Sequence, residues 1–461
     1  MALLFLPCFA LAQTSSGQNN DLDLIPQSVL QPQPEAQAAP HSGGRFYLED
    51  AFTRAWLHSS LAVPLPAYPP QTGDYTWQNR SSLDAMDQWT PAPHLLASLS
   101  DRFNLFEESD FDLDSSQTAA NDLREAYLTW EPMERRYLEA GRINLREGVA
   151  LGFNPTDFFR ARTQVAQASL DPSALREDRL GSFMLRTQTI WNGGSASLVY
   201  APQLESPRPL QAPPPVAFNP QIDRTNGDTR LMATLSWEVL DLSPQLLLFR
   251  EGSQTRYGLD LSRTIGQSVV GYAEWAGGRQ LPEAAQAQDF AARTGGLPPG
   301  LPPLPGGTGK SFRNDVAVGA SWTSAAKVTL NLELHYHQAG FSENQWRTWF
   351  SDGAAAAAQP VVTEGLWYVR SYASDRQDSL TRRRIFLRAD WADAFVERLE
   401  LSAFALVDND GSTLAQASAS YAWSDQWSGA AYFTGYFGGP RTEFGSLPQR
   451  GSATLSVTRY F

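Results

Sequence analysis

The stretch Gly451-Ser-Ala-Thr-Leu-Ser-Val-Thr-Arg-Tyr-Phe461 ends the chain and alternates between two kinds of side chain. Counted back from Phe461, every second residue is apolar apart from Arg459: Val457, Leu455, Ala453. The residues between them all carry a hydroxyl group: Thr454, Ser456, Thr458, Tyr460. Successive side chains of an extended chain point to opposite faces, so a period of two predicts a strand with one apolar and one polar face.

The same alternation recurs along the chain from Phe46 onward. It is clearest over 327–337, where the apolar set is Val328, Leu330, Leu332, Leu334, Tyr336 and the polar set is Thr329, Asn331, Glu333, His335, His337. The sequence predicts about eighteen such segments, at 46–58, 75–89, 93–102, 121–130, 135–143, 180–191, 195–202, 229–240, 245–251, 254–263, 267–278, 312–322, 327–338, 382–392, 396–408, 411–423, 426–437 and 450–461.

The connections between these segments fall into two length classes. Short connections follow every second segment: 90–92, 131–134, 192–194, 241–244, 264–266, 323–326, 393–395 and 424–425. Long ones fall between them: 59–74, 103–120, 144–179, 203–228, 279–311, 339–381 and 438–449. The proline-rich stretches 213–215 and 297–307 lie in the long class and are incompatible with regular structure. This sorting is typical of a transmembrane barrel with short periplasmic turns and long outer loops.

Composition agrees with a membrane barrel that has no apolar helix. Mean hydropathy is −0.34, and the sequence contains no run of 18 apolar residues. Only alternate residues of a barrel strand face lipid, and the 14 Trp suit aromatic girdles at the two interfaces. We therefore predict an all-β fold: a closed antiparallel transmembrane β-barrel of about 18 strands with both termini periplasmic. A soluble β-sandwich or propeller is the alternative, although no blade-length repeat is evident.

The two ends of the chain predict where the protein is located in the cell. Tyr460 and Phe461 resemble the C-terminal signal of bacterial outer-membrane barrels, which implies the barrel-assembly machinery and outer-membrane lipid as partners. Residues 1–12 are predicted to be a signal peptide that lacks a basic start, with Ala10-Leu11-Ala12 as the cleavage site and Cys8, the only cysteine, inside it. Residues 13–44 are predicted to be a disordered periplasmic arm, either a spacer or a partner contact, and residues 45–461 the barrel.

The most distinctive segment is 141–160, GRINLREGVALGFNPTDFFR, which starts at a predicted strand end and enters a long loop. If this loop folds inward, it brings Arg142, Arg146, Arg160 and Arg162 near the pore axis. Such a loop would constrict the pore, brace the wall, or do both. Alternation places further arginines on the interior face: Arg186, Arg230, Arg250, Arg256, Arg313, Arg382, Arg384, Arg388. The carboxylates predicted to oppose them are Glu125, Glu238, Glu274, Asp315, Glu333, Glu400, so a salt-bridge network that stiffens or plugs the lumen is the competing interpretation.

The chain resembles the alginate-export-type porins in four features: the Gly141-Arg142 strand end, the long loop that follows it, the number of strands and the terminal Phe461. That resemblance implies a large monomeric outer-membrane channel that conducts anionic sugar polymers through an arginine-lined lumen. Rings of charge tune ion selectivity, and guanidinium groups bind carboxylates well. The predicted function is therefore passive transport of small hydrophilic or anionic, sugar-like solutes.

Two other classes of function compete with transport. A plugged structural or adhesive barrel needs no conducting path, and a lipid-active enzyme needs a Ser and a His on the lipid-facing wall, for which His58 beside Ser59 and Ser60 is the one candidate. His335 and His337 with Glu333 lack a fourth ligand for a metal and are predicted to be solvated lumen residues. We predict no catalysis, no metal and no cofactor, and the net charge of −13 argues against nucleic acid as a partner.

Overall fold

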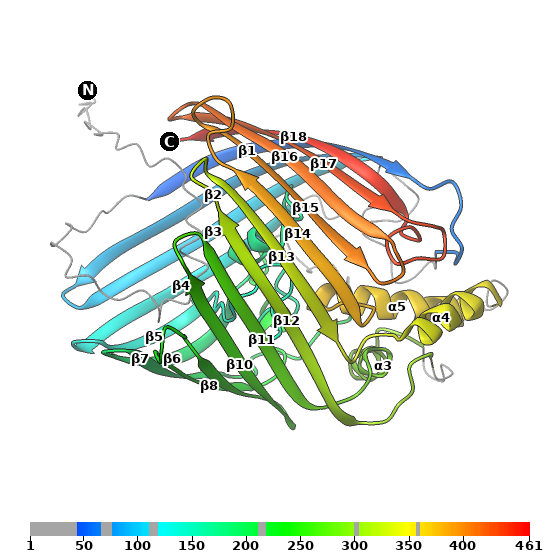
Figure 1. Cartoon of the computed structure of the whole chain (residues 1–461), viewed down its shortest axis with the longest axis horizontal. Helices are drawn as coiled ribbons and strands as arrows, with labels where there is room; N and C mark the ends of the chain where they lie inside the picture. Colours follow the sequence, from blue (N-terminus) through cyan, green and yellow to red (C-terminus); the bar gives the residue numbers. More distant parts are fainter. Residues whose placement is uncertain (1–43, 66–75, 110–118, 211–217, 299–303, 356–359) are drawn as a thin grey trace, which may run out of the picture.

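The protein is one closed barrel of eighteen antiparallel strands, seen in a computed structural model that describes residues 44–65, 76–109, 119–210, 218–298, 304–355 and 360–461 (Figure 1). The strands are β1 (Arg45–Leu57), β2 (Trp77–Ala92), β3 (Leu95–Glu108), β4 (Ala119–Met133), β5 (Arg136–Ile143), β6 (Ser182–Trp191), β7 (Gly194–Ala201), β8 (Arg230–Trp237), β9 (Gln245–Glu251), β10 (Gln254–Ile265), β11 (Val269–Gln280), β12 (Ser311–Thr323), β13 (Val328–His337), β14 (Arg383–Trp391), β15 (Leu399–Asp408), β16 (Thr413–Ser424), β17 (Trp427–Phe437) and β18 (Gln449–Tyr460). The predicted closed antiparallel barrel and its strand number are confirmed, and the periplasmic location of the termini stays a prediction. The predicted signal peptide (1–12) and most of the predicted arm (13–44) lie outside the described residues.

The C-terminal stretch closes the barrel. Strand β18 pairs with β17 on one side and with β1 on the other, in a register that sets Tyr47 opposite Tyr460 and Thr53 opposite Thr454. The Phe461 amide donates to the Phe46 carbonyl at 3.0 Å, and their rings lie 5.4 Å apart. Closure leaves no edge unpaired among the described strands, which a sheet in lipid requires.

The barrel has two unlike ends. At the turn end, where β1 begins and β18 ends, consecutive strands are joined by connections of two to seven residues. At the loop end lie the connections 58–76, 109–118, 144–181, 202–229, 281–310, 338–382 and 438–448, together with two short ones after β9 and β15. The predicted sorting of connection lengths is thus present, and both described termini lie at the turn end.

The long loops contain helices that alternation did not predict: α1 (Pro172–Glu177), α2 (Ile222–Thr225), α3 (Glu283–Thr294), α4 (Glu343–Ala355) and α5 (Pro360–Arg376). In Figure 1, α3, α4 and α5 lie together at the loop end, away from the C-terminus. Among the described residues, no helix is long and apolar enough to cross a membrane. Of the proline-rich stretches, 213–215 and 299–303 fall outside the described residues.

The outward face carries the predicted apolar residues, bounded by two aromatic belts. Near the turn end the belt consists of exposed tryptophans: Trp89, Trp130, Trp191, Trp322, Trp423. Near the loop end it consists of Trp56, Tyr200, Tyr257, Phe312, Phe437. On β13 the predicted alternation is confirmed residue by residue, because Leu330, Leu332 and Leu334 are exposed while the residues between them are buried. These belts are the girdles expected at two membrane interfaces.

Candidate functional site

Residues 144–181, called here the inner loop, run through the inside of the barrel. The inner loop bonds to strands all around the wall: Ala166 O accepts from Arg80 on β2, Glu147 from Gln245 on β9, and Leu170 N donates to Gln416 on β16. A segment that reaches opposite walls of a closed barrel lies in its lumen. The inner loop therefore folds into the lumen, as the prediction of an inward-folded loop has it.

Two buried wall carboxylates hold the middle of the inner loop. Glu274 on β11 accepts from the amides of Val149 and Ala150 and, at 3.0 Å, from the Thr156 hydroxyl. Glu333 on β13 accepts from Leu151 N at 2.6 Å and Gly152 N at 2.9 Å. Charged acceptors make the stronger class of hydrogen bond, and buried amides left without a partner are costly. The amides of 149–152 therefore fix the loop to two strands.

A glycine lets the loop approach Glu274 so closely. Gly148 has φ 92°, in the region that favours glycine, and a Cβ there would lie 2.6 Å from Glu274 Oε1. Both backbone conformation and space thus require glycine at the position preceding the tethered amides.

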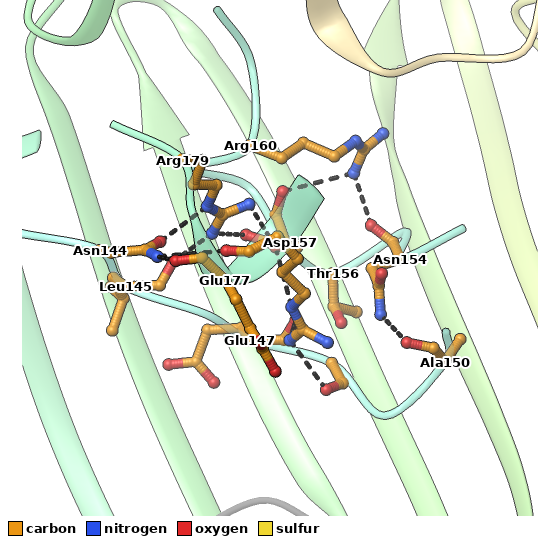
Figure 2. Close-up of polar contacts among 12 residues, drawn as sticks. Asn144, Leu145, Glu147, Ala150, Asn154, Thr156, Asp157, Arg160, Glu177 and Arg179 are labelled. Atoms are coloured by element: carbon orange, nitrogen blue, oxygen red, sulfur yellow. Dashed lines mark hydrogen bonds and ion pairs between the residues drawn. The ribbon is translucent and has the colours of Figure 1, made fainter. Parts of the chain in front are cut away.

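The inner loop is also braced within itself, as Figure 2 shows. The Arg179 guanidinium donates to both oxygens of Asp157, at 2.7 and 3.0 Å, and to Asn144 Oδ1 and Leu145 O at 2.8 and 2.6 Å. Arg160 donates to the Asn154 carbonyl at 2.5 Å. The turn Asn154-Pro155-Thr156-Asp157 therefore supplies the Asp157 carboxylate, which binds Arg179 near the C-terminal end of the inner loop.

A second set of contacts joins the inner loop to the outer loops. Arg160 pairs with Asp378 at 2.5 Å, and Arg162 pairs with Asp375 at 3.2 Å. The Arg160 and Arg376 guanidiniums hold the pKa of the Asp378 carboxyl well below its ordinary value despite burial. Two of the four arginines predicted to fold inward, Arg160 and Arg162, thus tie the inner loop to the end of α5 and the residues after it.

A hydrophobic cap covers part of the loop end. It is built from α3, α4, α5 and neighbouring loops around the buried Trp346, Trp349 and Trp367. The Arg370 guanidinium lies 5.1 to 5.7 Å from the centres of these three rings and donates to Ser446 Oγ and Glu443 O at 2.7 and 2.6 Å. Burial lowers the pKa of Arg370 to about 10. The cap therefore links 338–382 to 438–448.

Beside the cap lies a pocket of about 1070 Å³ including its open mouth, called here the vestibule. It lies between the inner loop, the loop 202–229, α3, α5 and strands β8 to β11. Six arginines line it: Arg162, Arg224, Arg230, Arg256, Arg293, Arg376. Four carboxylates line it too: Asp228, Glu251, Asp289, Asp375. Arginines therefore outnumber carboxylates among the lining residues, although Arg256 and Arg376 also pair with Asp315 and Asp378, which do not line the vestibule. The wall also contains Phe158, Phe249, Phe290 and Tyr372.

The vestibule arginines are held in place by aromatic rings and partners. Arg230 lies 4.6 Å over the Phe159 ring, and Arg256 lies 5.0 Å over Phe158 while pairing with Asp315 at 2.6 Å. Burial lowers the pKa of Arg162, whose guanidinium lies over Phe290. Guanidinium groups fixed in this way present N–H donors to a carboxylate with little loss of side-chain entropy.

The other arginines predicted to line the lumen are engaged as follows. Arg186 pairs with Glu139 at 3.0 Å, and Arg388 pairs with Asp171 and Asp390 at 3.1 and 3.0 Å. Arg384 pairs with Asp408 and Glu443. Two more donate to backbone carbonyls at the loop end: Arg313, Arg382.

Three further arginines that were predicted to line the lumen have other environments. Arg142 is fully buried and donates to the carbonyls of Gly181 and Pro220, so it braces two loops, and Arg146 is exposed. Arg250 is exposed on the outward face of β9 between alternating buried residues, so its predicted interior position is wrong. The prediction assumed that the polar face of a strand points inward. On β9 the inward residues are Gln245, Leu247 and Phe249, and the last two are apolar and pack on the inner loop.

Sequence reasoning missed Arg224, Arg293 and Arg376 in the vestibule. All three lie in or next to the helices of long loops, where a period of two carries no information. His335 and His337 face the interior as predicted, but the prediction that they are solvated is wrong: both are buried, and His335 bonds to Glu333 at 2.7 Å and His337 to Asp315 at 2.8 Å. Within the described residues no group of three or more His, Cys, Asp or Glu could hold a metal ion, and His58 Nε2 has no hydrogen-bond partner.

No protein-family model matches the sequence, and no curated protein does. Among solved structures, OccAB3 of Acinetobacter baumannii is similar with a TM-score of 0.51 at 9% identity, over 92% of this chain and 100% of that one. OccAB4 of Acinetobacter baumannii (TM-score 0.49, 8% identity, 92% and 100% covered) and OccK11 of Pseudomonas aeruginosa (0.48, 12%, 91% and 95%) are also similar. The chain therefore shares the fold of OccAB3.

Proposed function

We propose that the protein is a passive channel of the bacterial outer membrane for small hydrophilic solutes, with a preference for anions. The observation that carries the proposal is the vestibule, where six arginines face four carboxylates at the loop end of a closed barrel. An entrance lined by more guanidinium groups than carboxylates attracts anions and favours their passage. The closed barrel fold, shared with OccAB3, supports the proposal.

The inner loop narrows the path below the vestibule. Its backbone occupies the lumen between β2, β9 and β16, and hydrogen bonds to Glu274 and Glu333 hold it there. A narrowed lumen favours small solutes such as single sugar acids over long polymers. The alginate-type solute implied by the resemblance is therefore a weaker proposal than a monomeric sugar acid.

A liposome-swelling experiment tests this function. Refolded protein in vesicles should admit gluconate faster than glucose, which is similar in size and uncharged. Arg293→Glu replaces a half-exposed vestibule cation, and we expect it to lower the gluconate-to-glucose ratio by about three- to tenfold, which corresponds to about 0.7 to 1.4 kcal/mol. Arg441→Glu, an exposed arginine of 438–448 that does not line the vestibule, is the matched control.

A plugged structural barrel is the second candidate. It is favoured by the hydrophobic cap and by the pairing of Arg160, Arg384 and Arg388 with carboxylates. No swelling with either solute, in protein whose barrel is shown to be folded, would favour this second candidate.

A further inference from the structure

Two exposed arginines lie close together on the outer wall of the barrel at its loop end. Arg250 on β9 lies directly opposite Thr255 on β10. The register of β10 with β11 pairs Arg256 with Gly278, so one step further toward the loop end Thr255 lies next to Arg279. Neighbouring strands are about 4.8 Å apart, so Arg250 and Arg279 are about 10 Å apart on the two sides of one threonine.

The alternation of burial shows that these three side chains point away from the lumen. Arg250 and Arg279 are exposed, and each follows a buried residue of its strand. Thr255 lies on the same face of β10 as the exposed Tyr257, whereas Arg256 between them lines the vestibule. We call Arg250, Thr255 and Arg279 the outer arginine site.

The two guanidinium groups of this site have no anionic partner within the described residues. Arg250 Nε donates to the carbonyl of Gly252 at 3.2 Å, and no described carboxylate lies within ion-pair distance of either arginine. At the other end of β10, in contrast, the outward Arg263 lies 3.9 Å from a carboxylate oxygen of Asp241. Two adjacent positive charges on the outer wall are therefore available to an anion from outside the chain.

Two other outward arginines near the loop end lack this arrangement. Arg54 on β1 has Trp77 and Ala453 as its cross-strand neighbours, and Arg383 on β14 has Tyr336. A single arginine at a membrane interface can extend its charged end into water. The outer arginine site differs because two guanidinium groups can converge on one ligand beside a hydroxyl group.

The depth of the site along the wall indicates which ligand reaches it. Toward the loop end, the outward residues of β9 are Leu246, Leu248, Arg250, and those of β10 are Leu261, Leu259, Tyr257, Thr255. Phe312 on β12 lies opposite Arg279 and belongs with Tyr257 to the aromatic belt. Leucine is thus followed by an aromatic ring and then by arginine and threonine, which is the order expected where a membrane passes from hydrocarbon to headgroups.

We propose that the outer arginine site binds the phosphate group of a membrane lipid, preferably a phosphate monoester. Guanidinium groups form strong charge-assisted hydrogen bonds with phosphate, and two of them match the charge of about −1.5 to −2 on a monoester. The Thr255 hydroxyl supplies a further donor between them. The exposed Leu246 and Leu248 below the site contact the acyl chains, which a soluble phosphate lacks. This inference rests on the membrane setting of the barrel and is independent of what the lumen conducts.

Native mass spectrometry of the refolded protein in detergent tests the site. The protein is titrated with phosphatidic acid, whose phosphate is a monoester, and with phosphatidylcholine, whose headgroup has no net charge. We expect tighter binding of phosphatidic acid. Arg250→Gln and Arg279→Gln should each weaken that binding about fivefold, and the double variant should weaken it about thirtyfold. Transport through the lumen should be unchanged in these variants.

The double variant Arg263→Gln/Arg383→Gln is the matched control. It removes the same charge from two outward positions whose cross-strand neighbours include no arginine. In about 150 mM ammonium acetate, charges more than about 8 Å apart are largely screened, so this control should change binding less than about twofold. Heat-dependent migration on a denaturing gel checks that each variant is folded.

Three results would each overturn the proposal. The first is equal binding of phosphatidic acid and phosphatidylcholine to the wild type. The second is equal weakening by the two double variants, because it would mean that only the total charge matters. The third is displacement of phosphatidic acid by an equal concentration of inorganic phosphate, because the site would then take a soluble anion instead of a lipid.

Discussion

The hydrogen bonds that Glu274 accepts predict how firmly the inner loop is held in the lumen. Glu274→Ala removes the acceptor for Val149 N, Ala150 N and Thr156 Oγ1 in a buried site. Hydrogen bonds to a charged group contribute about 1.5–3 kcal/mol each, and they are not fully additive, so we expect a loss of about 3–6 kcal/mol of local stability. That loss corresponds to about 10²- to 10⁴-fold more frequent opening of the loop.

Hydrogen exchange measures this opening directly. In the folded barrel, the amides of Val149 and Ala150 should exchange about 10²- to 10⁴-fold faster in Glu274→Ala, and Glu274→Gln, which keeps one acceptor oxygen, should fall between it and wild type. Glu139→Ala is the matched control, because Glu139 faces the lumen from β5 but pairs with Arg186 instead of the inner loop. Unchanged protection of residues 149–156 in Glu274→Ala would refute the tether.

Three further predictions concern the ends of the barrel. Burial raises the pKa of Glu443 to about 8 from an ordinary 4.5, so the cap stability it supports is complete below pH about 4.5 and is lost as pH rises through about 8. Amide hydrogen exchange of residues 438–448, corrected for intrinsic rates, should therefore become faster between pH about 4.5 and about 8. In Glu443→Gln the corrected exchange rate should be independent of pH. A corrected rate that does not change with pH in the wild type would contradict this prediction. Trp349→Ala empties a fully buried site and should lower the stability of the cap by about 3–5 kcal/mol. The measurement is proteolysis, which should be faster within 338–382 while the barrel stays intact. The conservative Trp349→Phe should restore resistance to the protease, and resistance equal to wild type in both variants would argue against the cap. Deleting Phe461 removes its ring contact and its hydrogen bond with Phe46 and should lower the folded fraction in outer membranes several-fold by heat-modifiable gel migration, whereas Phe461→Tyr should assemble normally.

The barrel could be predicted from the sequence because its strands obey one simple rule. Alternation on β13 and β18 reports which side of the wall each residue occupies, and a strand has only two sides. Connection lengths then separate the turn end from the loop end. The rule failed at Arg250 because it assumes a polar interior. There the interior residues Leu247 and Phe249 pack against Phe158 and Phe159 of the inner loop, so both faces of β9 are apolar.

The vestibule could be predicted only in part. Arg230 and Arg256 lie on strands and were found by alternation, whereas Arg224, Arg293 and Arg376 come from loop helices. Their convergence depends on how long loops pack on one another through contacts such as Arg162 with Asp375, which join residues far apart in the chain. Single-sequence periodicity contains no information on such contacts.

Single-channel recording of the refolded chain in a planar bilayer under a salt gradient tests the central claim most directly. The account predicts stable open steps whose reversal potential shows anion preference, weakened in Arg293→Glu and unchanged in Arg441→Glu. Insertion of folded barrels without any conductance, or open steps with cation preference, would contradict the account of an arginine-lined anion channel.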